Sequence, residues 1–397
     1  MSKTGIFSLE GDRSKYPQVN SDGNFDIDLQ SHKYIKLWHG PNHPGITGNM
    51  SVELTVCSDE VVEAKTHVGY LHRGFEKLME RRKYIQNFPL VCRIAVPEPD
   101  YNEFNYATCI ENLTDIQVPE KGLWLRTLVL EMARLQGYLM WLGGIAGALG
   151  FGTVGQWSNY LRDLILDRFE ELTGARIYHI YILPGGVRND LPKGFESRME
   201  ANLIEIEGFM KDIRRVLFDN YVFKKRTKEM AIIKPEWVFP YGIVGPNARA
   251  AGIALDVRKD YPYGKYSELD FDIITATDSD IYTRTFVRYQ EILTDVDLIR
   301  QILKKMPTDG LFVASLPNLM NLKIPAGETY VRSECTRGEY GYYLVSDGSE
   351  YPRRVNVRGP SYTHAIALLE KMLINANIAD VAQIMVSLHT YPPEIER

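Results

Sequence analysis

The segment from Leu135 to Leu161 contains no charged residue, and it limits the possible folds more than any other part of this chain. An apolar run of that length is long enough either to span a bilayer or to form a buried helix. Seven glycines interrupt the run, together with polar residues such as Gln156. Because Arg134 and Arg162 continue an amphipathic pattern on its two sides, the pattern favours a buried helix, a glycine-rich turn and a second helix from about Ser158. We therefore predict a soluble protein, or one that lies peripherally on a larger assembly.

Helical patterns fill the middle of the chain, and strand patterns stand near both ends. Apolar residues at helical spacing predict helices over 70–84, 103–113, 124–142, 158–172, 196–218, 282–303 and 364–375. Alternating apolar and polar residues predict strands over 34–38, 50–57, 329–333, 340–345 and 353–358. Residues 1–33 form a polar N-terminal extension, in which we expect neither a signal peptide nor an anchor. Residues 34–397 are expected to form a single α+β domain that is mainly α.

Composition excludes several classes of protein. The 46 Lys and Arg residues against 51 Asp and Glu residues give a net charge of −5, so the chain offers no basic surface for nucleic acid. Four cysteines are present, and none lies within four residues of another: Cys57, Cys92, Cys109 and Cys335. That spacing excludes a disulfide scaffold, a zinc ribbon and an iron–sulfur site made by this chain alone. It indicates a reducing compartment.

Three loop regions combine glycine, proline and charge in a way that is typical of functional sites. His43 lies in a Pro/Gly-rich loop, Arg73 lies at a predicted helix start, and Pro97-Glu98-Pro99-Asp100 begins another helix. Each region also has a purely structural interpretation. His43 can bond its own turn, Arg73 can pair with Glu76 one turn on, and a proline with an aspartate is ordinary helix-start chemistry.

A fourth group of charges stands in an otherwise apolar loop region and consists of Arg249, Asp256, Arg258 and Lys259. It favours a fixed ion-pair network that holds loops together over an anion-binding site. No Walker, HExxH or nucleophile-elbow motif is present. The residues alone therefore indicate a large α+β protein with charged, glycine-rich loops and leave its reaction open.

Taken in order, these loops resemble one known family from about Lys36 to Arg397. Gly40-Pro-Asn-His-Pro44 is similar to the GPxHP loop of the 49-kDa component of respiratory complex I, and Gly69–Lys77 is similar to its GYLHRGxEK helix. Further matches are Arg176, Pro184-Gly-Gly-Val187, Asp190-Leu-Pro192, Arg249, Gly252, Asp256, Arg258, Lys259, Arg337-Gly-Glu339, Val345-Ser-Asp-Gly-Ser349 and Glu394-Ile-Glu-Arg397. The superfamily includes the large subunits of nickel–iron hydrogenases. The resemblance implies a central long-helix bundle with small β-sheets from the N- and C-terminal regions, docked on a small subunit that carries a 4Fe–4S cluster.

The positions where this sequence departs from the family pattern reduce the number of activities that the resemblance allows. A hydrogenase of this superfamily holds its nickel and iron with two CxxC pairs. The first pair corresponds here to Ala95 and Glu98, and the second to Tyr391 and Glu394. Such side chains cannot replace soft thiolates at a nickel–iron centre. The resemblance therefore implies that this chain binds no metal, is not a hydrogenase, and relies on a cluster held by a partner chain.

The quinone-reducing members of the family place a His, a Tyr and an Asp against the quinone head group. The His corresponds to His43, but the Tyr position holds Val96 and the Asp position holds Ala148. Losing that Tyr and Asp removes the expected proton donors for quinol formation. The family's histidine near the terminal cluster falls at Tyr178, with His179 adjacent.

The segment 97–100 looks most like that of hydrogenase-related large subunits that have lost their metal, such as the membrane-bound sulfane sulfur reductases. The resemblance implies that this subunit closes a pocket over the partner's terminal 4Fe–4S cluster, where polysulfide is reduced with electrons from ferredoxin. The expected catalytic residues are His43, Arg73, Glu98 and Asp100. Arg73 and His179 are also expected near the partner's cluster, where Arg73 would tune it and attract an anionic polysulfide.

The resemblance also implies a set of partners and a location. The partners are the small cluster-bearing subunit, a ferredoxin-like cluster subunit, a 30-kDa-like subunit, a quinone-site-like helical membrane subunit and antiporter-like membrane subunits. The chain itself would bind no cofactor and would lie on the cytoplasmic side of the cell membrane. Two alternatives stay open: a complex I-type subunit that reduces a quinone, and a non-catalytic scaffold that couples the cluster arm to the membrane module.

Overall fold

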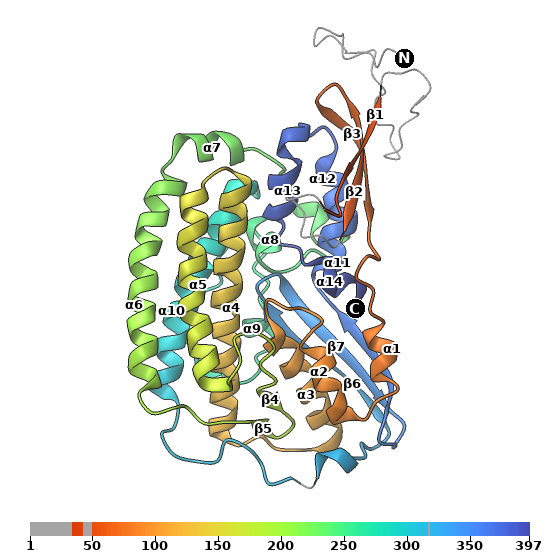
Figure 1. Cartoon of the computed structure of the whole chain (residues 1–397), viewed down its shortest axis with the longest axis vertical. Coiled ribbons are helices and arrows are strands. Elements are labelled where there is room, and N and C mark those ends of the chain that lie inside the picture. Colours follow the sequence, from red (N-terminus) through yellow and green to blue (C-terminus); the bar gives the residue numbers. More distant parts are fainter. Residues whose placement is uncertain (1–33, 43–49, 317) are drawn as a thin grey trace.

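The computed structural model describes residues 34–42, 50–316 and 318–397. In that part of the chain, long helices form a bundle, and two three-stranded antiparallel sheets flank it (Figure 1). This arrangement confirms the expected α+β fold, mainly α, with small sheets from the N- and C-terminal regions. The predicted extension over residues 1–33 lies outside the described residues.

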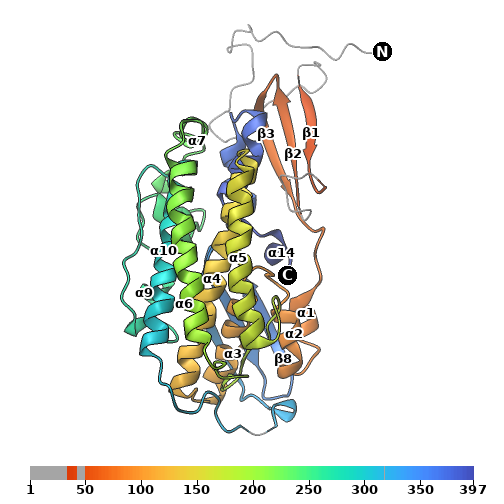
Figure 2. The same ribbon diagram turned by 60° about the vertical axis from the view of Figure 1, so that its left-hand side comes forward.

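Four helices build the bundle, namely α4 (Glu120–Ala148), α5 (Gly152–Thr173), α6 (Phe195–Ile213) and α10 (Ile281–Lys305). They run side by side along the long axis of the molecule, with α4 innermost (Figures 1 and 2). Because α4 is buried along nearly its whole length, the uncharged segment is a core helix followed by a turn, as predicted. Within the described residues, no helix is long and apolar enough to cross a membrane.

The glycine-rich turn is tighter than expected. The turn occupies residues 149–151, so the second helix begins at Gly152 rather than at about Ser158. A Cβ atom added at Gly143 would lie 3.5 Å from the carbonyl oxygen of Gly155. That distance is ordinary van der Waals contact, so α4 and α5 pack directly against each other at this point.

The two larger sheets confirm the predicted strands. The N-terminal sheet contains β1 (Ile35–His39), β2 (Ser51–Cys57) and β3 (Glu60–His67), and the C-terminal sheet contains β6 (Gly327–Cys335), β7 (Gly338–Ser346) and β8 (Pro352–Arg358). The strand β3 was not predicted; it follows β2 after a two-residue turn in which Ser58 has a positive φ of 59°. The helix α3 (Pro99–Thr114) packs on β6 and β7, and Tyr342 donates its hydroxyl to Asn102 Oδ1 at 2.6 Å.

The remaining elements are short. They are α1 (Phe75–Met79), α2 (Phe88–Val91), β4 (Ile182–Leu183), β5 (Gly186–Val187), α7 (Tyr221–Thr227), α8 (Gly245–Ala250), α9 (Val257–Asp260), α11 (Ser361–Thr363), α12 (Leu369–Leu373), α13 (Val381–Ser387) and α14 (Pro392–Glu396). The helix predicted over 70–84 is wrong in length: α1 starts only after Gly74, whose φ of +64° is incompatible with a right-handed helix. The helix predicted over 196–218 is present, and its last turn, Arg214–Phe218, is π-helical.

The charged loop cluster is an ion-pair network, as the sequence favoured. Arg249 lies 2.8 Å from Glu334 and 2.9 Å from Glu291, and Arg258 lies 2.8 Å from Asp256, with all five side chains at most 2% exposed. Lys259 is exposed and lies over the Phe271 ring. The network joins α8 and α9 to α10 and β6, so it fixes the loops against the bundle.

Candidate functional site

The two segments that correspond to the hydrogenase CxxC pairs are joined by one arginine. Glu98 precedes α3, Glu394 lies in α14, and Arg337 lies between β6 and β7. Arg337 Nη1 is 3.3 Å from Glu98 Oε1, and its Nη2 is 3.1 Å from Glu394 Oε2. All three side chains are at most 1% exposed. A buried Glu–Arg–Glu triad therefore links the two positions where the thiolates are missing.

Further donors fix both carboxylates of the triad. Thr336 donates to Glu98 through its backbone N–H at 3.3 Å and through its hydroxyl. The backbone N–H of Ser361 donates to Glu394 Oε1 at 2.9 Å. Burial opposes the charge on Arg337, but Glu394 and Glu98 outweigh it and raise the pKa of Arg337 well above its ordinary value. The triad is thus a charged and enclosed unit.

A second buried pair lies at the start of α3. His179 Nδ1 is 2.9 Å and 3.1 Å from the two carboxylate oxygens of Asp100, and its Nε2 is 3.2 Å from the carbonyl oxygen of Arg176. The imidazole stacks on the Phe169 ring, with centroids 4.0 Å apart. Burial lowers the pKa of His179, but Asp100 outweighs it, so the pKa is raised. Because both ring nitrogens face acceptors, the geometry suits an imidazolium that is ion-paired with Asp100.

Sequence reasoning missed a third acid, Glu103, one helical turn after Asp100. Its carboxylate accepts hydrogen bonds from the backbone N–H groups of Ile180, Tyr181 and Ile182 at 2.7, 2.8 and 3.1 Å. Burial and the neighbouring Asp100 raise the pKa of Glu103 to about 8. The i, i+3 spacing on one helix face was the signal that could have found it. Asp100, Glu103 and His179 together can hold and exchange a proton.

Arg73 connects the loop before α1 to both segments of the triad. Its Nη1 donates to the Arg93 carbonyl at 2.6 Å, and its Nη2 donates to the Pro393 carbonyl at 3.0 Å. Among the described residues it has no carboxylate within 4.0 Å, because Glu76 pairs with Arg354 and Arg397 instead. The proposed Arg73–Glu76 pair is therefore absent. The partners of the Arg73 guanidinium are carbonyl oxygens and the Phe75 ring, whose centroid is 4.3 Å from Cζ.

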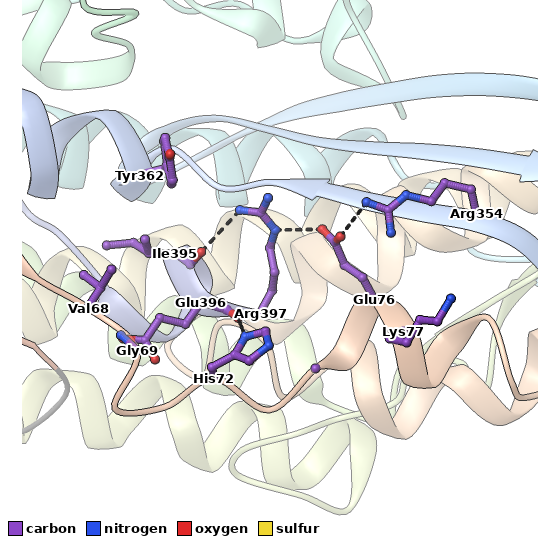
Figure 3. Close-up of a pocket in the computed structure, with 11 residues that line it drawn as sticks. Val68, Gly69, His72, Glu76, Lys77, Arg354, Tyr362, Ile395, Glu396 and Arg397 are labelled. Carbon is purple, nitrogen blue, oxygen red and sulfur yellow. Dashed lines mark hydrogen bonds and ion pairs between the residues drawn. The ribbon is translucent and has the colours of Figure 1, made fainter.

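A cavity of about 420 Å³ lies between the loop before α1, α1 itself, β8 and α14 (Figure 3). His72, Lys77 and Arg354 line it together with apolar side chains such as Ile395. His72 Nδ1 lies 2.5 Å from the Glu396 carbonyl oxygen, which ties the loop to the C-terminal helix. The cavity adjoins Arg73 in sequence, since His72 and Gly74 both line it.

The structure brings part of the predicted site together. Asp100 contacts His179, and Arg73 contacts the segments that carry Glu98 and Glu394. Glu98 and Asp100 are fully buried with partners, so neither lines the cavity of Figure 3. His43 lies outside the described residues.

Comparisons with known proteins identify the family. The family described as "Respiratory-chain NADH dehydrogenase, 49 Kd subunit" matches residues 148–322 and 316–397. The D subunit of the NADH-quinone oxidoreductase of Thermosipho melanesiensis is 43% identical over 364 residues, covering 91% of this chain and 99% of that protein. This chain belongs to the 49-kDa subunit family.

Two other relatives of this 49-kDa-type subunit come from different complexes. The D subunit of the F(420)H(2) dehydrogenase of Methanosarcina mazei is 34% identical over 372 residues, covering 93% of this chain and 99% of that protein. A chain in the solved structure of the membrane-bound sulfane sulfur reductase (MBS), an archaeal respiratory membrane complex, superposes with a TM-score of 0.89 at 42% identity. That match covers 92% of this chain and 99% of the other. The 49-kDa-type subunit is thus a subunit of an oxidoreductase complex.

Proposed function

We propose that this chain is the large subunit of a membrane-bound, ion-pumping respiratory complex, and that it forms the acceptor pocket over a partner's terminal 4Fe–4S cluster. The acceptor is sulfane sulfur, as polysulfide, and the electrons come from ferredoxin. The observation that carries the proposal is the Glu98–Arg337–Glu394 triad, because it fills the place of the hydrogenase thiolates with a closed ion-pair unit. The likeness to a chain of the sulfane sulfur reductase supports the same reaction.

Arg73 is the residue we assign to the acceptor. It is half-buried and has no carboxylate partner among the described residues, and its sequence neighbours His72 and Gly74 line the cavity of Figure 3. That cavity has cations at Lys77, Arg354 and Arg397, carboxylates at Glu76 and Glu396, and an apolar wall at Ile395. Glu76 pairs with Arg354 and Arg397, and Lys77 pairs with Glu80. We therefore assign the attraction of the anionic end of a polysulfide to Arg73, while its apolar sulfur chain suits the apolar wall.

The chemical step requires electrons from the cluster and a proton. Two electrons break one S–S bond of the polysulfide and leave two anionic sulfur species, and one proton converts the released sulfide into HS⁻. We propose that His179 and Asp100 supply this proton from inside the protein, with Glu103 as the neighbouring acid. Glu98 then acts as a positioning residue, since its carboxylate holds Arg337.

We further propose the assembly around this subunit. Its partners are the small subunit with the terminal cluster, a ferredoxin-like cluster subunit, a 30-kDa-like subunit, a quinone-site-like helical subunit and antiporter-like membrane subunits. The complex would carry this chain on the cytoplasmic side of the membrane.

Quinone reduction is the second candidate. The 43% identity with the D subunit of an NADH-quinone oxidoreductase favours it. Against it, Val96 and Ala148 stand where that family's proton-donating Tyr and Asp are expected. A non-catalytic scaffold is the third candidate and predicts that substitutions at the site leave turnover unchanged.

One experiment separates the three candidates. The assembled complex is assayed with reduced ferredoxin and either polysulfide or a soluble quinone, as wild type, Arg73→Ala and the exposed control Arg82→Ala. We expect polysulfide-dependent ferredoxin oxidation to fall about tenfold or more in Arg73→Ala, by loss of electrostatic attraction, and to be unchanged in Arg82→Ala. Turnover with quinone alone would support the second candidate. Normal turnover by an assembled Arg73→Ala complex would remove our role for Arg73.

A further inference from the structure

Eight charged side chains form a closed cluster in the core, apart from the proposed acceptor site. Three are guanidinium groups and five are carboxyl groups: Arg134, Arg249, Arg258, Glu131, Asp256, Glu291, Asp295 and Glu334. Each is at most 2% exposed. No solvent is therefore available to balance their charges.

The charges in this cluster do not cancel. With every carboxyl group ionised, three positive and five negative charges would leave an excess of two negative charges. Arg288, one turn before Glu291, is the next cation on α10, and among the described residues it has no carboxylate within 4.0 Å. Even if Arg288 is counted, one negative charge remains. An uncompensated charge in the core is costly, and a carboxyl group in that position takes up a proton instead.

Two of the five carboxyl groups, those of Glu131 and Asp295, lie near the same two arginines. Glu131 Oε1 is 3.4 Å and Asp295 Oδ1 is 3.5 Å from the same nitrogen, Arg258 Nη1. Both also lie near Arg134 Nε, at 3.9 Å and 3.2 Å. The second oxygen of each group, Glu131 Oε2 and Asp295 Oδ2, is buried without a hydrogen-bond partner. The two carboxyl groups therefore flank the same arginines, and each leaves one oxygen unsatisfied.

We infer that Asp295, which flanks the same arginines as Glu131, holds one proton in the folded protein, so that the interface of α4 and α10 is a proton-binding site. A proton on one group supplies the missing donor. It also lowers the excess to one negative charge, or to zero when Arg288 is counted. Burial, the largest effect, raises the pKa of Asp295 well above its ordinary value, and Glu131 raises it further.

The other acids are less suited to hold this proton. Burial raises the pKa of Asp256, but Arg258 and Arg249 outweigh burial and lower it. The pKa of Glu291 is lowered in the same way, chiefly by Arg249. Burial raises the pKa of Glu334 to about 7, but its oxygens already accept from Arg249 at 2.8 Å and from the Val257 N–H at 3.3 Å. A carboxyl group whose oxygens both accept hydrogen bonds favours its ionised form.

The titratable and charged groups around the pair come from every neighbouring element. They are Arg134 and Tyr138 of α4, Arg288 and Glu291 of α10, Arg249 of α8, Asp256 and Arg258 at α9, Glu334 of β6, Tyr101 of α3, and Tyr263 and Tyr266. Tyr266 donates its hydroxyl to Glu131 Oε1 at 2.6 Å, which favours Asp295 as the more protonated member.

The test uses the full-length chain as wild type, Asp295→Asn, Asp256→Asn, Glu334→Gln and the exposed control Asp297→Asn. Urea unfolding is followed across the pH range from 5 to 8. If the folded state binds one more proton than the unfolded state, the folding constant falls about tenfold for each unit by which pH rises in this range. We expect Asp297→Asn to keep the wild-type pH dependence. Asp295→Asn should show a dependence weaker by about tenfold per pH unit, because asparagine is a neutral mimic of the protonated acid.

The variants also distinguish an acid that holds a proton, as proposed for Asp295, from an ionised acid that serves only as an ion-pair partner, such as Asp256. Asp295→Asn should unfold near the wild-type urea midpoint at pH 7, whereas Asp256→Asn should unfold at a clearly lower midpoint. Infrared spectra should show a protonated carboxyl C=O band in the wild type that is missing in Asp295→Asn. The inference is overturned if Asp295→Asn keeps the wild-type pH dependence, if it loses as much stability as Asp256→Asn, or if Glu334→Gln alone removes the dependence.

Discussion

Arg337 Nη2 lies 3.1 Å from Glu394 Oε2, and both side chains are at most 1% exposed. The same guanidinium reaches Glu98, so one cation joins the start of α3 to the C-terminal helix α14. In a metal-holding relative, the ligands themselves would tie these segments together. Here an ion-pair unit does so, and the geometry explains how the fold persists without thiolates at these positions.

Removing the cation of the triad should destabilise the fold strongly. Arg337→Met leaves Glu98 and Glu394 buried without a counter-charge, which typically costs about 3–5 kcal/mol. The free energy of unfolding in urea measures the loss. Arg215→Met is the control, since Arg215 is exposed and 3.6 Å from Asp212; it should have little effect. Equal stability of the two variants would contradict the structural role of the triad.

Two glycines of α4 should respond in opposite ways to alanine. A Cβ at Gly137 would clash with the carboxylate of Glu98 and lie 3.1 Å from Thr336 Cγ2, whereas nothing lies within 4 Å of a Cβ at Gly147. We expect Gly137→Ala to lower stability by about 1–3 kcal/mol through overpacking. Gly147→Ala should raise it by up to about 1 kcal/mol, since alanine is the better helix former. Thermal unfolding of both variants checks the sign; a stabilising Gly137→Ala would show that Glu98 moves aside freely.

The pair of His179 and Asp100 should make stability depend on pH. The pKa of His179 is raised in the folded state above its ordinary value of 6.5. Its contribution is therefore fully present below pH 6.5 and is lost as pH rises through the folded pKa. His179→Gln and Asp100→Asn should each remove this loss, which urea midpoints measured from pH 6 upward would detect. A wild-type profile in either variant would mean that the pair is not charged.

Periodicity predicted most of the fold because local spacing fixes helices and strands. The long helices α4, α5, α6 and α10 and the strands β1, β2 and β6 to β8 all follow from it. It failed before α1, where Gly74 adopts a left-handed conformation. It also missed β3, whose pairing with β2 depends on the turn at Ser58.

The site was less predictable, because its partners are distant in sequence. Arg73 Nη1 and Nη2 donate to carbonyls 20 and 320 residues away, and its neighbour Glu76 pairs with Arg354 and Arg397. Glu103 is a candidate site residue only because the fold places the backbone N–H groups of residues 180–182 against its carboxylate. No local pattern encodes such contacts.

The sequence by itself determined that the segment from Leu135 to Leu161 is a core helix and a turn, and that all four thiolates of a nickel–iron site are missing. The first follows from residue type and spacing, and the second from the resemblance of the sequence to the hydrogenase superfamily. Only the tertiary structure decided what replaced the thiolates, since Arg337 is separated by 239 residues from Glu98 and by 57 from Glu394. It also decided that Glu131 and Asp295 flank the same two arginines, Arg134 and Arg258. Burial and the path of the chain, rather than composition, set which charges face each other.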